Sequence, residues 1–378
     1  MALKAVHVSD VPNLDQVQEN ASLSLYSSRL SKGVEVGRTA SFKAPKFLVI
    51  GHRGNGMNML QSSDSKMKAI KENTILSFNT AGNYPVDFVE FDVQVTKDGC
   101  PIIFHDNFIF SEEDNNTISE KRVTELSLSE FLAYGPQKES GVQGKTLLRK
   151  TKDGKILNWG VESDDSFCTL QEAFLEVNPA LGFNIELKFD DCVVYKEEYL
   201  IQVLQATLQV VFDHAKGRPV IFSSFQPDAA LLVKKLQSTY PVFFLTNGGN
   251  ELYKDVRRNS LDEAIKLCLE GGLDGIVSEV RGVFRNPSAV NKIKELKLSL
   301  MTYGKLNNVA EAVYMQHLMG IDGVIVDLVQ EITEAVAKMV KTSEEESEEE
   351  QMQVQNRPQF SQRELAFLLK LIPELIQQ

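Results

Sequence analysis

The chain has 378 residues, of which 43% are hydrophobic and 24% charged, and its formal net charge at pH 7 is −12. This composition is typical of a folded globular protein, and the negative charge argues against binding to nucleic acid. No apolar run approaches the roughly 18 residues needed to cross a bilayer, which argues against a transmembrane segment.

We interpret residues 1–45 as an N-terminal extension. They contain no apolar segment of the kind that directs secretion, and the four cysteines of the chain have no CxxC spacing, which favours reduced thiols over a disulfide framework. The stretch 21–45 is rich in serine and includes several basic residues. We therefore expect an intracellular protein that is not secreted, located in the cytoplasm or in a plastid such as the chloroplast.

Between residues 46 and 340, short runs of β type alternate with amphipathic helical patterns. The eight runs are 47–51, 87–93, 182–188, 219–224, 241–246, 273–278, 298–303 and 321–326. A crossover helix returns each strand in the same direction, so this alternation predicts parallel pairing. Eight such units can close an α/β fold of the (β/α)8 TIM-barrel type. An open, doubly wound sheet is the competing architecture.

One further β-type run, 101–105, follows the second strand after too few residues for a parallel crossover. Asp98-Gly99 is a hairpin turn signal, so this run is expected to fold back antiparallel on the second strand. The barrel is therefore expected to have a small insertion after strand 2, at about 94–168. We predict one helix near 124–133 within it and otherwise a polar loop.

The character of the chain changes after residue 340. Six glutamates between 344 and 350 contribute half of the net charge, and we expect the first part of 341–378 to be a disordered acidic linker. An amphipathic helix is predicted at 361–376, where Ser361 and Glu364 form a capping box. The helix is expected to dock on the barrel, on a partner or on a second copy of the chain; a species-specific extension and contact with a membrane are the alternatives.

The carboxyl ends of the predicted strands include a concentrated set of polar residues, and barrel enzymes place their catalytic groups at these ends. The first strand supplies His52 and Arg53, the second Glu90 and Asp92, the third Glu186 and Lys188, and the hairpin His105. An isolated Glu-x-Asp pair is usually only a polar strand end. The presence of all these groups at one barrel mouth is what indicates a site.

Three carboxylates at this mouth need a positive charge. Strand side chains alternate with a period of two, so Glu90 and Asp92 share a face, and burying carboxylates is costly unless cations meet them. Arg53 and Lys188 do not suffice for three carboxylates. We therefore expect one divalent cation, Mg²⁺ or Ca²⁺ rather than Zn²⁺, because all of its protein ligands would be oxygen atoms.

Taken together, the motifs of the chain resemble those of the glycerophosphodiester phosphodiesterase family, and of its plant members in particular. They are His52-Arg53-Gly54, Glu72-Asn73-Thr74, Glu90-x-Asp92, Lys97-Asp98-Gly99, His105-Asp106, Glu186-x-Lys188, Ser223-Ser224-Phe225 and Asp322-Gly323 with Asp327. The similarity covers nearly all of residues 46–340. The family consists of (β/α)8 barrels with a small insertion after the second strand, which agrees with the pattern of the chain.

The resemblance implies a role for each candidate residue. Glu90, Asp92 and Glu186 would hold the metal, His52 and His105 would be the acid–base pair, Arg53, Lys188 and Tyr303 would bind substrate, and Glu72 and Asn73 would support these groups. Of the two orders, we take His52 as the base and His105 as the acid. Tyr303 stands where relatives often have tryptophan, and Lys71 where many have proline.

The implied reaction is metal-dependent hydrolysis of a small-molecule glycerophosphodiester, for example glycerophosphocholine or glycerophosphoethanolamine. The products would be sn-glycerol 3-phosphate and an alcohol. The attacking group is either water or the glycerol 2-hydroxyl of the substrate, which would form a cyclic phosphate. One alternative is lysophospholipase D-type cleavage of lysophospholipids, which needs an apolar groove beside the mouth. The other is an inactive phosphate-ligand-binding module, whose usual mark is a missing histidine or carboxylate.

Overall fold

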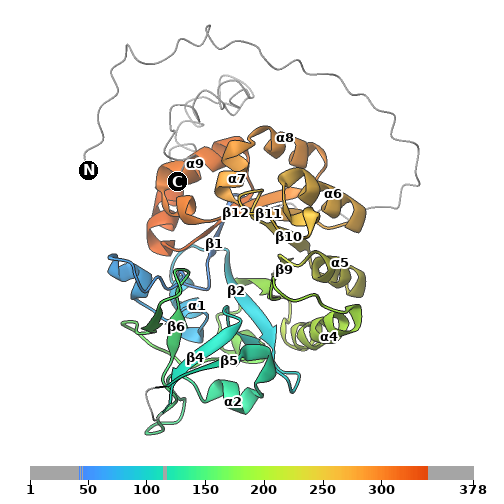
Figure 1. The fold of residues 1–378 in the computed structure, drawn as a ribbon. Coiled ribbons are helices and arrows are strands. Elements are labelled where there is room, and N and C mark those ends of the chain that lie inside the picture. Colours follow the sequence, from blue (N-terminus) through green and yellow to red (C-terminus); the bar gives the residue numbers. More distant parts are fainter. Residues whose placement is uncertain (1–41, 43, 45, 114–116, 339–378) are drawn as a thin grey trace.

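Eight parallel strands close into a barrel in the computed structural model, which describes residues 42, 44, 46–113 and 117–338 (Figure 1). In chain order the strands are β1 (Leu48–Gly51), β2 (Phe88–Val95), β8 (Gly182–Leu187), β9 (Val220–Ser224), β10 (Val242–Thr246), β11 (Gly275–Glu279), β12 (Ser299–Tyr303) and β13 (Gly323–Val326). Strand β1 pairs in parallel with both β2 and β13, so the sheet has no open end at β1. The predicted TIM barrel is confirmed, and the open sheet is excluded.

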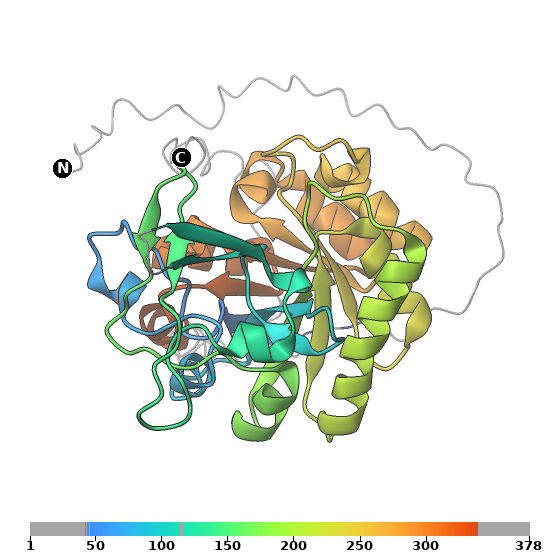
Figure 2. The same cartoon turned by 60° about the horizontal axis from the view of Figure 1, so that its bottom comes forward.

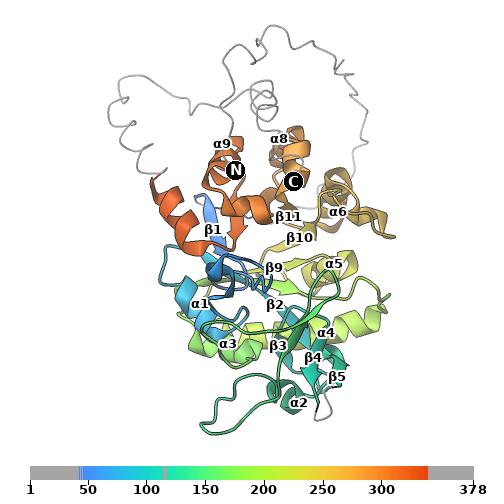
Figure 3. The same cartoon turned by 60° about the vertical axis from the view of Figure 1, so that its left-hand side comes forward.

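Helices surround the barrel and connect its strands (Figures 1 and 3). They are α1 (Ile75–Ala81), α3 (Leu170–Glu176), α4 (Glu197–His214), α5 (Pro227–Leu236), α6 (Leu261–Gly271), α7 (Val280–Arg285), α8 (Ser288–Glu295) and α9 (Ala310–Met319). Short 3-10 helices occur at η3 (Ser65–Lys68), η5 (Val256–Arg258) and η6 (Lys305–Asn308), and a further helix occupies 329–338. No helix within the described ranges is both long and apolar enough to cross a membrane.

The barrel strands separate two hydrophobic cores, one inside the barrel and one between the strands and the helices. Side chains such as Ile50, Phe243 and Met301 fill the barrel interior, whereas Phe91 and Leu187 belong to the larger core between strands and helices. Because neighbouring residues on a strand alternate between these two sides, Glu90 and Asp92 must point inward with Phe88. The period of two therefore determines which polar side chains reach the barrel mouth.

The amino-terminal end of the barrel is covered by a residue that precedes the first strand. The Phe42 ring lies 5.5 Å from that of Phe243 in an edge-on arrangement. The carbonyl of Phe42 also accepts a hydrogen bond of 2.8 Å from Ser299 Oγ. This contact closes the end opposite the mouth.

The insertion after strand 2 has its own sheet and core. Strand β3 (Pro101–Ile103) pairs antiparallel with β2, as the hairpin signal predicted. A separate sheet then follows, in the order β5-β4-β6-β7, and Figure 2 shows it to one side of the barrel strands. Its strands are β4 (Phe108–Glu112), β5 (Ile118–Arg122), β6 (Leu148–Lys150) and β7 (Ile156–Asn158).

The predicted helix of the insertion is present as α2 (Leu128–Leu132), preceded by the 3-10 helix η4 (Val123–Glu125). The expectation of a polar loop over the rest of the insertion was wrong, because β4 pairs with β5 and β6 pairs with β7 there. The strands β6 and β7 have only three residues each, too few to show a periodic pattern, and β5 has a single apolar residue, Ile118. The acidic linker and the helix expected at 361–376 lie outside the described residues, as do residues 1–41.

Candidate active site

The barrel mouth brings together the candidate residues that the sequence placed far apart. His52 and Arg53 follow β1, Glu90 and Asp92 lie on β2, Glu186 is near the end of β8 and Lys188 just beyond it, His105 follows β3, and Tyr303 ends β12. Glu72 and Asn73 precede Thr74, whose side chain caps the start of α1 by accepting a hydrogen bond from Ser77 N. All of these positions are therefore on the carboxyl-terminal side of the barrel.

Three buried carboxylates form the centre of this mouth. Ligand atoms of Glu90, Asp92 and Glu186 all lie within 4.8 Å of one another. Burial and the adjacent charge of Asp92 raise the pKa of Glu90 to about 8. Burial also raises the pKa of Glu186, despite the opposing effect of Lys188. The cluster is therefore short of positive charge at neutral pH.

The chemistry of the donor atoms fits a divalent cation. Glu90 Oε1 is buried and has no hydrogen-bond partner in the described part of the chain, and the same is true of Asn73 Oδ1. Buried acceptors of this kind are normally satisfied. Glu90, Asp92 and Glu186 supply only oxygen ligands, which suits Mg²⁺ or Ca²⁺. These three residues are the ones that would hold the ion.

Two basic side chains border the carboxylates but do not neutralise all of them. Lys188 Nζ lies 2.9 Å from Glu186 Oε1 and 3.7 Å from Asp92 Oδ1. Arg53 Nη1 donates to Glu72 Oε1 at 2.7 Å, and Arg53 Nε lies 3.4 Å from Asp92 Oδ2. Glu90 instead accepts a hydrogen bond of 2.9 Å from the neutral backbone N–H of Arg53.

The backbone of two site residues is held in the left-handed region, which is uncommon for residues other than glycine. Arg53 has a φ of 49° and Asn73 a φ of 59°. The two are joined, because Asn73 N donates to the carbonyl of Arg53 at 3.0 Å. The Asn73 side chain in turn donates to Asp92 Oδ2 at 2.9 Å. Strained backbone of this kind concentrates at functional sites.

His52 is oriented by Asp327, which follows the last barrel strand. The two side chains meet at 2.7 Å between Nδ1 and Oδ1. Burial raises the pKa of Asp327, but the charge of His52 and hydrogen bonds from His52, Asn308 and Met57 N outweigh it and hold the pKa at about 2. Asp327 is thus an acceptor, so His52 donates from Nδ1 and presents Nε2 to the site, 3.9 Å from Glu90 Oε2.

The second histidine has the same kind of partner in different surroundings. His105 Nδ1 lies 2.7 Å from Asp106 Oδ1. Burial and the nearby charges of Arg53 and Lys188 hold the pKa of His105 well below its usual value. For His52, burial lowers the pKa, but the Asp327 carboxylate outweighs it and the net pKa is raised. The two imidazoles therefore differ in their tendency to hold a proton, which is greater for His52.

Tyr303 occupies another wall of the mouth. Its hydroxyl donates to Asn247 Oδ1, and its ring lies edge-on to Phe225 at 5.9 Å between centroids. Burial, together with Glu279 and Glu186, raises the pKa of Tyr303 well above its usual value. Tyr303 is therefore a neutral hydroxyl at working pH.

Sequence reasoning missed several residues of this mouth. Asp327 was part of a motif but had no assigned role, although its place directly after the last strand was the available signal. Asn308, which accepts from the backbone N–H of Asp327 and donates to its side chain, was missed because it lies on a connecting segment. Arg149, on β6 of the insertion, is buried beside Asp106 and Glu72 and had no sequence signal.

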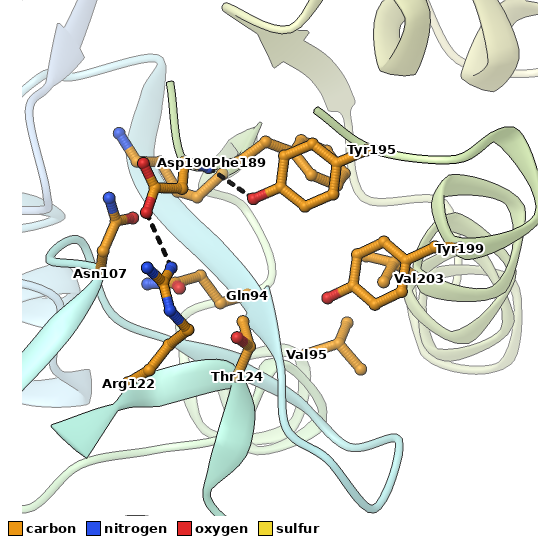
Figure 4. Close-up of a pocket in the computed structure, with 11 residues that line it drawn as sticks. Gln94, Val95, Asn107, Arg122, Thr124, Phe189, Asp190, Tyr195, Tyr199 and Val203 are labelled. Atoms are coloured by element: carbon orange, nitrogen blue, oxygen red, sulfur yellow. Dashed lines mark hydrogen bonds and ion pairs between the residues drawn. The ribbon is translucent and has the colours of Figure 1, made fainter. Parts of the chain in front are cut away.

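A small pocket opens next to Lys188, between the end of β2, the insertion and α4 (Figure 4). One wall is aromatic, because Tyr195 and Tyr199 stack with their ring centroids 5.5 Å apart. On the other side Arg122 donates to Asp190 Oδ2 at 2.7 Å, the ion pair drawn in Figure 4. Lys188 thus borders both the carboxylate cluster and this pocket.

Comparisons with known proteins agree with this geometry. A family model described as the glycerophosphoryl diester phosphodiesterase family matches residues 52–331. The chain is 65% identical over 378 residues to glycerophosphodiester phosphodiesterase GDPD1, chloroplastic, of Arabidopsis thaliana, covering 100% of both chains. It is 62% identical to GDPD2 of the same plant, again covering 100% of both.

Solved structures share the fold at low sequence identity. A phosphodiesterase from Oleispira antarctica, in complex with the product sn-glycerol-3-phosphate, is 20% identical, with a TM-score of 0.55 over 78% of this chain and 97% of that one. A glycerophosphodiester phosphodiesterase from Parabacteroides distasonis is 19% identical, with a TM-score of 0.52 over 77% of this chain and 98% of that one. At these identities the likeness supports the fold alone.

Cation binding to the metal-free protein should release protons. Glu90 has a pKa of about 8 in the metal-free state and must ionise to act as a ligand, so binding at pH 7 displaces its proton. The apparent affinity for Mg²⁺ or Ca²⁺ should therefore rise as the pH increases toward 8. Calorimetry in two buffers of different ionisation enthalpy measures the proton count. Equal heats in both buffers would contradict the assignment, and Glu90→Gln should bind more weakly without this proton release.

Proposed function

Because the chain belongs to the glycerophosphoryl diester phosphodiesterase family, we propose that it hydrolyses small glycerophosphodiesters such as glycerophosphocholine and glycerophosphoethanolamine to sn-glycerol 3-phosphate and an alcohol. The observation that supports this most is the meeting of three buried carboxylates and two carboxylate-anchored histidines at one barrel mouth. No catalytic residue expected from the family motifs is missing, which argues against an inactive binding module.

The charges of the mouth suit a phosphodiester anion. A divalent cation held by Glu90, Asp92 and Glu186 would supply electrostatic stabilisation to the phosphoryl oxygens. Arg53 Nε is buried and makes no hydrogen bond among the residues described, although it lies 3.4 Å from Asp92 Oδ2, so its N–H would be able to donate to a phosphoryl oxygen. Lys188, whose pKa is raised by Glu186 and Asp92 against the effect of burial, remains a cation at neutral pH.

The surroundings of the histidines favour His105 as the base and His52 as the acid, the reverse of the order taken from the sequence. A neutral imidazole accepts a proton, and burial together with the nearby cations holds the pKa of His105 well below its usual value. His105 Nε2 would then accept the proton of the attacking hydroxyl, which belongs to water or to the glycerol of the substrate. A protonated imidazole donates, and Asp327 favours the charged form of His52. His52 Nε2 would then protonate the leaving alcohol.

Lysophospholipase D-type cleavage is the second candidate, because apolar side chains are exposed beside the mouth. Among the described large apolar side chains, the three most exposed are Val194 at 98%, Leu252 at 85% and Val256 at 64%. All three lie on the loops that follow β8 and β10, as does Val193, and we call these four residues the apolar rim. An exposed apolar patch often marks a binding surface.

The two loops of the apolar rim are tied together. Arg258 Nη1 donates to Asp191 Oδ1 at 2.6 Å, which joins the loop after β10 to the loop after β8. The Arg258 guanidinium also lies 3.7 Å from the ring centroid of Tyr253, the neighbour of Leu252. We therefore propose that an acyl chain attached to the glycerol of the substrate can lie along the rim, next to the pocket that Lys188 borders.

A plastid location is also proposed, since the Arabidopsis relative that is 65% identical over the full length is named chloroplastic. Residues 1–41, which would direct it, lie outside the structure described above. Imaging of the chain fused at its carboxyl terminus to a fluorescent protein would report the compartment.

The proposed reaction is tested by head-group release. The protein should liberate choline from glycerophosphocholine and ethanolamine from glycerophosphoethanolamine, with glycerol 3-phosphate in both cases. EDTA should abolish turnover, and Mg²⁺ or Ca²⁺ should restore it. Asp92→Ala should lower kcat by at least about 10²-fold with the circular dichroism spectrum retained. Full activity after exhaustive chelation would rule out the metal, and no release from either substrate would rule out the reaction.

The acid–base order is tested with an activated leaving group. Removing an acid matters less when the leaving group needs no proton, so His52→Ala should lose about 10²–10⁴-fold on glycerophosphocholine and much less on a glycerophosphodiester of p-nitrophenol. His105→Ala should lose a similar factor on both substrates, because the base acts on the attacking hydroxyl. Steady-state kcat values decide the matter. The opposite pattern would restore His52 as the base.

Replacing an apolar side chain of the rim with a charged one tests whether the rim binds an acyl chain. Val194→Asp and Leu252→Asp should lower kcat/KM for lysophosphatidylcholine by about tenfold or more, equivalent to about 1.4 kcal/mol, and leave glycerophosphocholine hydrolysis unchanged. Leu175→Asp is the matched control, because Leu175 is 58% exposed on α3 and does not lie on either rim loop. If the rim variants hydrolyse both substrates as the wild type does, the acyl chain does not bind there.

A further inference from the structure

The insertion contributes one buried side chain to the active site. Arg149, on β6, is only 8% exposed. In the sequence it lies 43 residues after Asp106 and 37 residues before Glu186. Its guanidinium is positioned between two carboxylates of the barrel mouth, Asp106 and Glu72.

On one side Arg149 binds the carboxylate that holds His105. Arg149 Nε donates to Asp106 Oδ2 at 3.0 Å, and Nη2 donates to Asp106 Oδ1 at the same distance. Oδ1 is the atom that lies 2.7 Å from His105 Nδ1. Because both oxygens of Asp106 accept from a fixed cation, the carboxylate cannot rotate without breaking this two-point contact.

On its other side Arg149 is fixed by Glu72. Nη1 donates to Glu72 Oε2 at 3.0 Å, and Nη2 donates to Glu72 Oε1 at 2.9 Å. Burial raises the pKa of Glu72, but Arg149 and Arg53 outweigh it and hold the pKa at about 2, so Glu72 stays an anion. Arg149 therefore has one carboxylate partner that anchors it and a second that it positions.

The plane of the guanidinium is also set by an aromatic ring. Arg149 Cζ lies 4.0 Å from the ring centroid of Trp159, which is buried in the core of the insertion. Trp159 Nε1 donates to Asn58 Oδ1 at 3.0 Å, and Asn58 N donates to Glu72. Asn58 thus connects the Trp159 ring to Glu72. The two groups that Arg149 contacts here, the ring and the Glu72 carboxylate, are held in place relative to each other.

We propose that Arg149 is a positioning residue that acts through Asp106 on His105, so that the insertion forms part of the catalytic machinery. The inference rests on the proposed function for its kinetic consequence, but the orientation of His105 is a property of the protein alone. The planar fork of arginine makes two bonds to each carboxylate. Lysine keeps the charge but cannot reproduce this geometry.

Arg149→Lys is the variant that tests the proposal. It should lower kcat by about 10²-fold, the effect of a small misplacement of a catalytic group, with a smaller change in KM. In the His105→Ala background the same change should lower kcat less than threefold, because the group being positioned is gone. Equal losses in the two backgrounds would overturn the proposal.

Arg218→Lys is the matched control. Arg218 is 5% exposed, donates to the carbonyls of Asn178, Leu181 and Val177, and lies 4.1 Å from the ring of Phe183. It precedes β9 and so lies at the barrel end opposite the mouth. This variant should lower Tm as Arg149→Lys does but leave kcat unchanged. If both variants reduce kcat in proportion to their loss of Tm, the role of Arg149 is only structural.

A spectroscopic readout separates this proposal from the proposed function. The Nδ1–H proton of His105, identified in histidine-labelled protein by its absence in His105→Ala, should give a downfield resonance in the wild type. Arg149→Lys should shift or broaden it, and Arg218→Lys should not. An unchanged resonance in Arg149→Lys overturns the positioning role. Failure of the wild-type protein to hydrolyse any glycerophosphodiester would instead overturn the proposed function, and this signal would still report the geometry.

Discussion

The structure of the mouth depends on the crowding of three buried carboxyl groups, which repel one another when all are ionised. Without a cation Glu90 escapes part of this repulsion by holding a proton, because burial and Asp92 raise its pKa to about 8. Glu90, Asp92 and Glu186 have ligand atoms within 4.8 Å of one another. At an effective dielectric constant of about 20, two unit charges at this separation repel by roughly 3 kcal/mol. Such repulsion persists in a folded protein only where other groups balance it. The surrounding side chains provide this compensation. Lys188 and Arg53 supply positive charge, and the Asn73 side chain donates a hydrogen bond to Asp92.

Closure of the barrel completes the same site. His52 follows the first strand and Asp327 the last, and the two strands are neighbours in the ring. The segment after β1 packs tightly against the residue that follows β13, since a Cβ added at Gly56, whose φ is +105°, would lie 2.3 Å from the carbonyl oxygen of Asp327. Only a glycine fits there. The orientation of His52 is therefore a consequence of joining the two ends of the sheet, and the site cannot form before the barrel does.

The sequence predicted most of the fold because strands in a parallel barrel leave a strong local pattern. All eight strands, the antiparallel β3 and the inward direction of Glu90 and Asp92 follow from short apolar runs and a period of two. The strands β6 and β7 were missed because three residues are too few for any period. The hairpin of β4 and β5 was missed because β5 has only one apolar residue, Ile118. Arg149 was missed for a different reason: a buried arginine on a polar segment looks like a surface residue until its carboxylate partners are known.

The two histidines show why roles are harder to predict than positions. Each donates from Nδ1 to an aspartate at 2.7 Å, so motif and local geometry are alike. They differ in what else is near. Burial and Arg53 lower the pKa of both, but Asp327 and Glu90 outweigh this at His52 and raise its pKa, whereas Lys188 and Arg149 lower that of His105 further. These groups come from separate barrel units and from the insertion, and no sequence spacing encodes their distances. The charge distribution around each imidazole, and not its motif, therefore determines which one holds a proton.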